Sequence, residues 1–206
     1  MTTPQNCAII VLAAGASRRL GQPKQLLPLG STTLLGHTIS VALQSGCQPV
    51  VVVAGAHEEA VKKILEKPGI TVLQNAGWHE GMASSVRMGL QFLTTHYPQV
   101  LRVVLMVCDQ PFVNKKHLLC LADTHQSTGK GIVASSYGGK MGTPALFSNS
   151  YFDELLKLTG DTGARNLLIR FKTDVATVNF AEGDIDIDTP EDYKKILEQW
   201  SEGHDS

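Results

Sequence analysis

The sequence predicts an α/β fold in which helices cover both sides of a mainly parallel sheet. Short apolar segments alternate along the chain with longer segments whose apolar residues recur at helical spacing. The short segments are rich in β-branched residues and contain few polar ones, as expected of strands buried on both faces. Alternation of strands and helices favours parallel pairing, because each crossover helix packs against the sheet.

The first half of the pattern begins with the segment CAIIVLA at 7–13, which is apolar throughout and predicts a buried strand. Residues 32–46 have helical periodicity and predict a helix. PVVVVAG at 49–55 predicts the second strand. Residues 57–67, with apolar positions among Glu and Lys, predict a second helix, and ITVLQN at 70–75 predicts the third strand.

The pattern continues with an amphipathic helix predicted over 82–96 and a strand predicted over 100–109. In this strand, the six residues VVLMVC before Asp109 are apolar. A further helix is predicted over 114–127 and a further strand over 131–137. Each segment repeats the preceding alternation, which extends the predicted parallel sheet.

The C-terminal part is less regular. Strands are predicted over 143–148 and 175–180, and short helices over 150–158 and 162–171. The last helix is predicted over 189–200. Thr189 can cap this helix and Pro190 fits its first position. Glu191 and Asp192 favour the positive end of the helix dipole.

Length and composition predict a single domain over 1–200, with a frayed end over 201–206. A net charge of −1 provides no global basic field for nucleic acid. No apolar segment is long enough to span a bilayer, and the N-terminal residues lack the pattern of a secretory signal, so we expect a cytoplasmic protein. The cysteines form no C-x-x-C pair, and we expect all of them to be reduced: Cys7, Cys47, Cys108 and Cys120.

The loop that follows the first strand combines small residues with cations. Gly15 lies at its start, and Arg18, Arg19 and Lys24 follow. The loop lacks the Gly-Lys-Ser/Thr ending of a Walker A motif and the three-glycine spacing of a dinucleotide fingerprint. What remains is a turn whose backbone N–H groups can approach phosphates. The alternative is a solvated basic turn.

Asp109 directly follows an apolar strand, where a carboxylate is poorly placed for stability and well placed to bind a divalent cation. Mg²⁺ in proteins typically takes one or two carboxylates together with substrate phosphates. The segment at 186–190, DIDTP, offers a second carboxylate, either Asp186 or Asp188. The alternative for Asp188 is a capping role at the last helix.

Two further segments carry polar groups at predicted helix starts. Ser84 and Ser85 begin the helix over 82–96, where hydroxyl and N–H groups can bind sugar or phosphate oxygens, although simple capping explains them equally well. Arg165 lies in the polar segment GDTGAR, where it can hold an anionic acceptor or lie on the surface.

Taken in order, these motifs resemble those of the MobA-like nucleotidyltransferases, in particular the molybdenum cofactor cytidylyltransferases. The motifs span nearly the whole chain and are LAAGASRRLGQPKQLLPLG, GMASSVRMGL, CDQP, GTPALF, GDTGAR and DIDTPEDY. The resemblance implies a three-layer, Rossmann-like α/β/α fold with a mixed sheet. It also implies transfer of CMP from CTP to the phosphate of molybdopterin, which carries molybdenum, with Mg²⁺ as cofactor and pyrophosphate as the leaving group.

The resemblance assigns roles to residues of this chain. Lys24, Arg19 and Asp109 are implied as catalytic, Asp109 and Asp188 as the metal ligands, and Asp161 and Arg165 as the acceptor site. The implied nucleotide-binding residues are Leu12, Ala13, Ala14, Gly15, Arg19, Lys24, Ser84 and Ser85. The implied partners are CTP, the molybdopterin-type acceptor and a molybdoenzyme or its chaperone.

Two departures and three alternatives accompany the resemblance. Leu20 replaces a usual Met, and Thr143 stands where many close relatives have His, which leaves the acceptor open. Related guanylyltransferases carry Gly-Gly in place of Ala13 and Ala14. The alternatives are a nucleotidyltransferase that uses GTP, one that acts on a sugar phosphate, and a non-catalytic chaperone that binds the pterin cofactor.

Overall fold

A computed structural model describes residues 6–17, 19–57, 59, 61–62, 69–161 and 163–204. The helix predicted over 57–67 falls largely outside these residues, as do Arg18 and Thr162. In the described part of the chain, no helix is long and apolar enough to cross a membrane.

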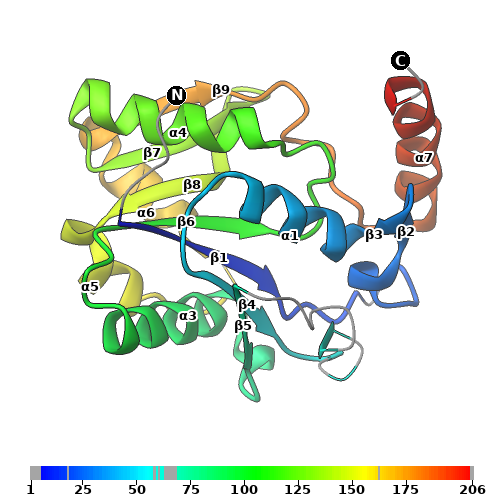
Figure 1. Cartoon of the computed structure of the whole chain (residues 1–206), viewed down its shortest axis with the longest axis horizontal. Coiled ribbons are helices and arrows are strands. Elements are labelled where there is room, and N and C mark those ends of the chain that lie inside the picture. The colour runs from blue at the N-terminus through cyan, green and yellow to red at the C-terminus, as the bar shows by residue number, and fades with distance from the viewer. Residues whose placement is uncertain are drawn as a thin grey trace.

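The centre of the molecule is a mixed seven-stranded sheet with the strand order β5-β4-β1-β6-β8-β7-β9 (Figure 1). The strands are β1 (Cys7–Ala13), β4 (Val50–Ala54), β5 (Ile70–Gln74), β6 (Arg102–Val107), β7 (Ile132–Tyr137), β8 (Lys140–Ser148) and β9 (Val175–Asn179). Only β8 runs antiparallel to its neighbours β6 and β7, and the other pairs in this sheet are parallel. The predicted fold class, mixed and mainly parallel, is confirmed.

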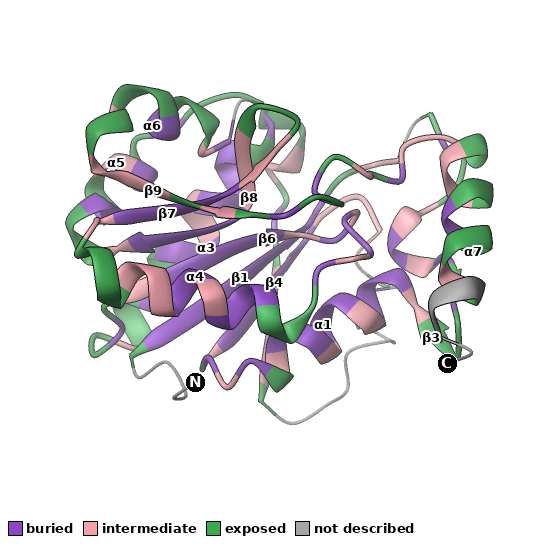
Figure 2. Ribbon diagram, turned by 90° about the horizontal axis from the view of Figure 1, so that it is seen from above, coloured by how far each residue is buried: buried purple, intermediate pink, exposed green. Residues whose placement is uncertain are grey.

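Helices cover both faces of the sheet, so that the central strands are buried between them, whereas the edge strands β5 and β9 are only partly buried (Figures 1 and 2). The helices are α1 (Leu34–Gln44), α3 (Met82–His96), α4 (Lys115–Thr128), α5 (Phe152–Leu156), α6 (Arg165–Arg170) and α7 (Pro190–His204). The helix predicted over 150–158 is shorter than expected, because its first residues form the 3-10 turn Asn149–Tyr151. The last helix continues through 201–204, where fraying was expected.

Side chains along β1 alternate between the two faces, as the pleat of a strand requires. Ile9 and Val11 join the core beneath α1 and α4, whereas Ile10 and Leu12 join the core above α3. Gly89 of α3 lies so close to β1 that a Cβ atom there would be 2.9 Å from Ile10 Cγ2. Each aliphatic side chain buried in this way contributes roughly 1.5–3 kcal/mol.

A third, smaller core joins α7 to the first half of the chain. It is formed by Leu20, Leu27, Leu29, Leu34, Ile187 and Ile196. It includes residues of a small hairpin, β2 (Pro28–Leu29) and β3 (Thr32–Thr33), that the sequence analysis did not predict. This packing holds the segment before α7 against the loop that follows β1, as Figure 1 shows on its right-hand side.

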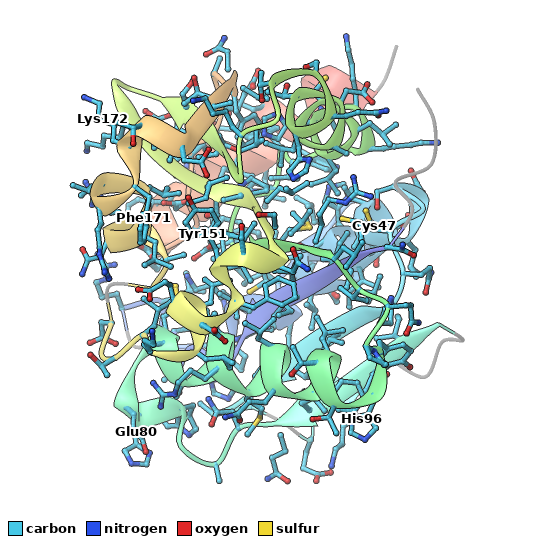
Figure 3. All side chains as sticks on the ribbon, turned by 90° about the vertical axis from the view of Figure 1, so that its left-hand side faces the viewer. Cys47, Glu80, His96, Tyr151, Phe171 and Lys172 are labelled. Atoms are coloured by element: carbon cyan, nitrogen blue, oxygen red, sulfur yellow. The ribbon has the colours of Figure 1, made fainter. Side chains whose placement is uncertain are left out.

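The opposite end of the sheet is closed by aromatic and polar contacts. Tyr151 and Phe171 pack edge to face with ring centroids 5.1 Å apart (Figure 3). The Tyr151 hydroxyl also donates a hydrogen bond of 2.6 Å to Asp174.

The four cysteines are free thiols, as predicted, and Cys120 is the only one of them that is not fully buried.

Candidate functional site

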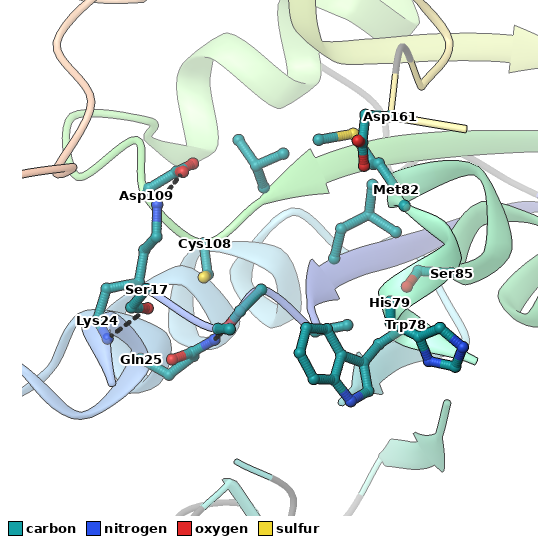
Figure 4. Close-up of a pocket in the computed structure, with 16 residues that line it drawn as sticks. Ser17, Lys24, Gln25, Trp78, His79, Met82, Ser85, Cys108, Asp109 and Asp161 are labelled. Carbon is teal, nitrogen blue, oxygen red and sulfur yellow. Dashed lines mark hydrogen bonds and ion pairs between the residues drawn. The ribbon is translucent and has the colours of Figure 1, made fainter. Parts of the chain in front are cut away.

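A cavity of about 510 Å³ lies at the carboxyl ends of β1 and β6, the end of an open parallel sheet where ligands bind (Figure 4). The loop over 14–17 forms one wall and the start of α3 forms another. Lys24 and Asp109 lie at one side of this cavity, and Asp161 lies at the other. The cavity is thus lined by segments that follow three different strands: the loop after β1, the turn after β5 and the residues after β6.

The turn after β1 is held by Gln25, a residue that the sequence analysis did not single out. Its side-chain amide donates hydrogen bonds to the carbonyls of Ala13 (2.9 Å) and Gly15 (3.0 Å). The backbone N–H of Lys24 donates to the Ser17 hydroxyl at 3.0 Å. Gln25 is only 1% exposed, which is unusual for a polar side chain. The signal in the sequence that could have identified it is a polar Gln between Lys24 and the apolar pair Leu26-Leu27.

The loop residues named from the sequence do not all face the cavity. Leu12, Ala14 and Gly15 line it, whereas Ala13 does not. The side chain of Ala13 belongs to the core beneath α1, since neighbouring residues of a strand face opposite sides of the sheet. The Ala13 side chain therefore faces away from the cavity, and the role implied for this residue stays a prediction.

Four charged side chains form a continuous network beside the cavity. The Lys24 ammonium lies between two carboxylates, 2.7 Å from Asp109 Oδ2 and 3.1 Å from Asp188 Oδ1. The Arg19 guanidinium lies 2.6 Å from the other oxygen of Asp188. The structure therefore brings together Arg19, Lys24, Asp109 and Asp188, as the sequence analysis expected.

The position of Asp188 follows from the start of α7. Thr189 and Asp192 form a reciprocal cap, in which the Thr189 hydroxyl donates to the Asp192 carboxylate (2.8 Å) and accepts from the Asp192 N–H (3.2 Å). The backbone N–H of Ile187 donates to the Asp109 carbonyl at 3.2 Å. Because Thr189 caps the helix, the Asp188 side chain contacts the cations instead.

The ionisation of the network follows from these contacts. Partial burial disfavours charge on Lys24, but the carboxylate of Asp109 and then that of Asp188 outweigh it and raise the pKa of Lys24 well above its usual value. Desolvation, and then the charges of Asp109 and Asp188, raise the pKa of the Asp186 carboxyl to about 7. Burial raises the pKa of the Cys108 thiol to about 12, so Cys108 stays protonated.

The residues present fit a divalent cation bound by two carboxylates. Asp109 and Asp188 already share one cationic group, the Lys24 ammonium, so their oxygens converge on a common point. Among the described residues, no three His, Cys, Asp or Glu side chains form a metal-binding cluster. A pair of carboxylates, as in Asp109 and Asp188, nevertheless matches Mg²⁺, which commonly binds one or two carboxylates and completes its shell with phosphates and water.

The two serines at the start of α3 have different surroundings. Asn75 Nδ2 donates to both hydroxyls, at 2.8 Å for Ser84 and 2.9 Å for Ser85. The Ser84 hydroxyl in turn donates to the carbonyls of Gly81 and Gly77. Ser84 therefore holds the helix start together and does not line the cavity, whereas Ser85 lines it. Internal partners thus engage the Ser84 hydroxyl, and its contact with a ligand stays a prediction.

A second cavity of about 460 Å³ adjoins the first and shares Met82, Val107 and Asp161 with it. Arg165 lines this second cavity, as do Asp184 and Asp186. Asp161, which the sequence analysis grouped with Arg165, therefore lies at the border of the two cavities. Asp186 faces the second cavity rather than the ion-pair network.

A close backbone approach joins these cavities. Gly81 has φ near +100°, and a Cβ atom there would lie 2.4 Å from the Asp161 carboxylate and 2.5 Å from the Gly160 backbone. The Gly160 carbonyl accepts a hydrogen bond from the N–H of Ala83 at 3.1 Å. Glycine is thus required at 81, since a side chain would both strain the backbone and displace the loop that carries Asp161.

Sequence reasoning missed several residues that line the first cavity. Trp78 and His79 lie on the 3-10 turn Trp78–Glu80, next to Met82 (Figure 4). Thr143, singled out as a departure from relatives, lines the second cavity and donates a hydrogen bond to the Gln110 side chain at 3.2 Å. An aromatic residue in a polar loop, as at Trp78, is the signal that could have drawn attention to this wall.

Comparison with known proteins agrees with this architecture. The model of the MobA-like NTP transferase domain matches residues 9–175. The chain is 30% identical to the purine catabolism protein PucB of Bacillus subtilis, over 91% of this chain and 94% of PucB. It is 26% identical to the molybdenum cofactor cytidylyltransferase of Escherichia coli, over 94% of this chain and 96% of the relative.

A solved structure is similar as well. The crystal structure of Rv0371C from Mycobacterium tuberculosis, in complex with manganese, has a TM-score of 0.75 and 31% identity, covering 93% of this chain and 97% of that one. The family model spans most of the chain, and these relatives are matched over nearly their whole length. The chain therefore belongs to the MobA-like NTP transferase family.

Proposed function

We propose that this protein is a Mg²⁺-dependent nucleotidyltransferase that transfers CMP from CTP to the terminal phosphate of a molybdopterin-type acceptor. The observation that carries the proposal is the ion-pair network of Arg19, Lys24, Asp109 and Asp188, whose Lys24 and Asp109 line the first of two adjoining cavities. One cavity accommodates the nucleotide and the other the acceptor. The similarity to a molybdenum cofactor cytidylyltransferase supports this choice of substrates.

In the proposed reaction, an oxygen of the acceptor phosphate attacks the α-phosphorus of CTP. A new P–O bond forms, and the bond from the α-phosphorus to the bridging oxygen breaks, so that pyrophosphate leaves with its electron pair. The nucleophile is already an anion and requires no general base. Catalysis therefore rests on alignment of the two substrates and on neutralisation of charge.

The residues of the chain supply these two effects. The turn over 14–17 and Ser85 surround the nucleotide cavity, and Arg165 faces the acceptor cavity. In this proposal the Lys24 ammonium, which lines the nucleotide cavity, and the Arg19 guanidinium neutralise the triphosphate and the departing pyrophosphate. Asp109 and Asp188 would hold Mg²⁺, which supplies further positive charge to the phosphates when bound. The manganese complex of Rv0371C supports a divalent cation in this role.

A second candidate follows from the similarity to PucB, which is named a purine catabolism protein and has the higher identity of the two curated relatives described above. In this alternative, the same site uses another nucleotide or another phosphorylated acceptor. Thr143 in the acceptor cavity, where close relatives of the cytidylyltransferases often have His, is consistent with a different acceptor.

A nucleotide panel tests the proposal. The protein is incubated with Mg²⁺ and molybdopterin, with and without molybdate, and with CTP, GTP or ATP in turn, and pyrophosphate and the dinucleotide product are quantified. We expect pyrophosphate and a cytidine dinucleotide with CTP. Turnover with GTP but not with CTP would favour the alternative in which the site uses another nucleotide. Binding of CTP without release of pyrophosphate would contradict a catalytic function.

Replacing Arg165 with alanine tests the assignment of the acceptor cavity. We expect the apparent KM for the acceptor to rise by roughly 10- to 150-fold, because a charge-assisted hydrogen bond contributes about 1.5–3 kcal/mol. The KM for CTP should change little, since Arg165 lines the second cavity and not the first. Arg170→Ala, on the same helix but paired with Glu154 at 2.7 Å, is the matched control. A rise in the KM for CTP alone would show that this cavity binds the nucleotide.

A further inference from the structure

The Lys24 ammonium lies between the two carboxylates that are proposed to hold a divalent cation. It contacts Asp109 at 2.7 Å and Asp188 at 3.1 Å, and the Lys24 side chain is only 13% exposed. The backbone of Lys24 is anchored by the hydrogen bond to Ser17. The two carboxylates that suit a metal are therefore already neutralised by a cation of the chain itself.

We propose that Lys24 is an internal counter-ion that keeps Asp109 and Asp188 from binding a divalent cation until a triphosphate draws the ammonium away. The metal and the nucleotide then bind together, and each strengthens the binding of the other. This inference deepens the proposed function and rests on it for the identity of the nucleotide. It makes Lys24 a determinant of metal binding as well as a contact of the phosphates.

The balance of charge supports this order of events. The four side chains that contact one another carry two negative and two positive charges: Asp109, Asp188, Arg19 and Lys24. A divalent cation that enters alone meets carboxylates whose charge is already compensated, and it must displace a cation that has no new partner. When a triphosphate is present, Lys24 and Arg19 gain phosphate oxygens as partners, and the carboxylates become available to the metal.

The geometry allows this exchange. Lys24, Ser17 and Asp109 all line the nucleotide cavity, so the ammonium can turn from the carboxylates toward a bound triphosphate by rotation of its own side chain. No movement of the sheet or of α7 is required, since the anchored atoms are those of the backbone.

Binding of Mn²⁺ in the absence of nucleotide and acceptor tests the proposal, measured by electron paramagnetic resonance or calorimetry. We expect Lys24→Met to bind Mn²⁺ at least about tenfold more tightly than the wild type, within the 5- to 150-fold range typical of coupling between two ligands. Lys24→Arg keeps the positive charge and should bind Mn²⁺ as weakly as the wild type. Lys157→Met, which removes an exposed lysine paired with Glu154, is the control and should change nothing.

Three further arms make the result decisive. The double variant Lys24→Met with Asp109→Asn should lose the increase in Mn²⁺ affinity expected of Lys24→Met alone. This loss would show that the Mn²⁺ binds at Asp109. If Lys24→Met does not unfold cooperatively and is therefore not properly folded, Lys24→Gln is measured in its place. Glutamine is uncharged but keeps a hydrogen-bond donor for the carboxylates. In the wild type, an unreactive CTP analogue should increase Mn²⁺ binding to the protein by at least about tenfold, because coupling between two ligands is reciprocal.

The proposal is overturned if the uncharged variants bind Mn²⁺ no more tightly than the wild type, if Lys24→Arg gains as much as Lys24→Met, or if the analogue leaves wild-type Mn²⁺ binding unchanged. The variant measurements contain no acceptor and no turnover. A gain in Lys24→Met therefore supports the inference even if the wild type fails to release pyrophosphate from CTP, and that failure would contradict the proposed function alone.

Discussion

Asp109→Asn is expected to lower kcat for pyrophosphate release by at least about 10²-fold, the loss that follows removal of one preorganised electrostatic contact. Asparagine keeps the shape of the side chain but removes the charge that holds Lys24 and, in the proposed reaction, the metal. The fold should remain intact, because the side chain lies beside a cavity and outside the apolar cores. Initial rates with saturating CTP and acceptor give the effect, and circular dichroism checks folding.

Asp153→Asn is the control for this experiment. Asp153 is an exposed carboxylate on α5, outside both cavities, and its loss should leave kcat unchanged. A folded Asp109→Asn variant with a rate close to that of the wild type would show that Asp109 neither holds the metal nor positions Lys24.

Ala14→Gly is expected to narrow the preference for CTP over GTP without abolishing the use of CTP. Ala14 and Trp78 both line the nucleotide cavity, and both lie against Gly55, where an added Cβ atom would be 2.8 Å from the Cβ of each. The methyl group of Ala14 should crowd a purine more than a pyrimidine. One methyl-sized difference in a pocket discriminates by about 1–3 kcal/mol, or roughly 10- to 200-fold.

Ala13→Gly is a matched control, because it removes the same methyl group from the neighbouring residue. Ala13 faces the core beneath α1 and does not line the cavity. The ratio of kcat/KM for CTP and GTP should therefore change only in Ala14→Gly. An equal change in both variants would point to loosening of the strand end, and a wild type that prefers GTP would contradict the assignment of the base.

Much of the fold was predictable because local patterns determine it. The alternation of apolar strands and amphipathic helices predicted the sheet and its helical layers. Local signals also located the start of α7, where Thr189 accepts the hydrogen bond expected of a cap and Asp192 adds a return bond that was not predicted. The hairpin of β2 and β3 was missed, since strands of two residues are too short to carry a periodic pattern.

The candidate site was predictable only as a set of segments. The position of Asp109 after an apolar strand and the cations after β1 indicated which residues could act together. The sequence by itself thus determined the elements, the ends of the strands and the charged residues found there.

The tertiary structure alone decided which of these side chains meet. Lys24 pairs with Asp109, 85 residues away, and with Asp188, 164 residues away. The choice of Asp188 over Asp186 depends on the cap of α7 and on the small core that holds this segment against the loop after β1. Periodicity describes neighbours along one element, whereas contacts between elements depend on how their apolar faces pack, and that packing is a property of the whole chain.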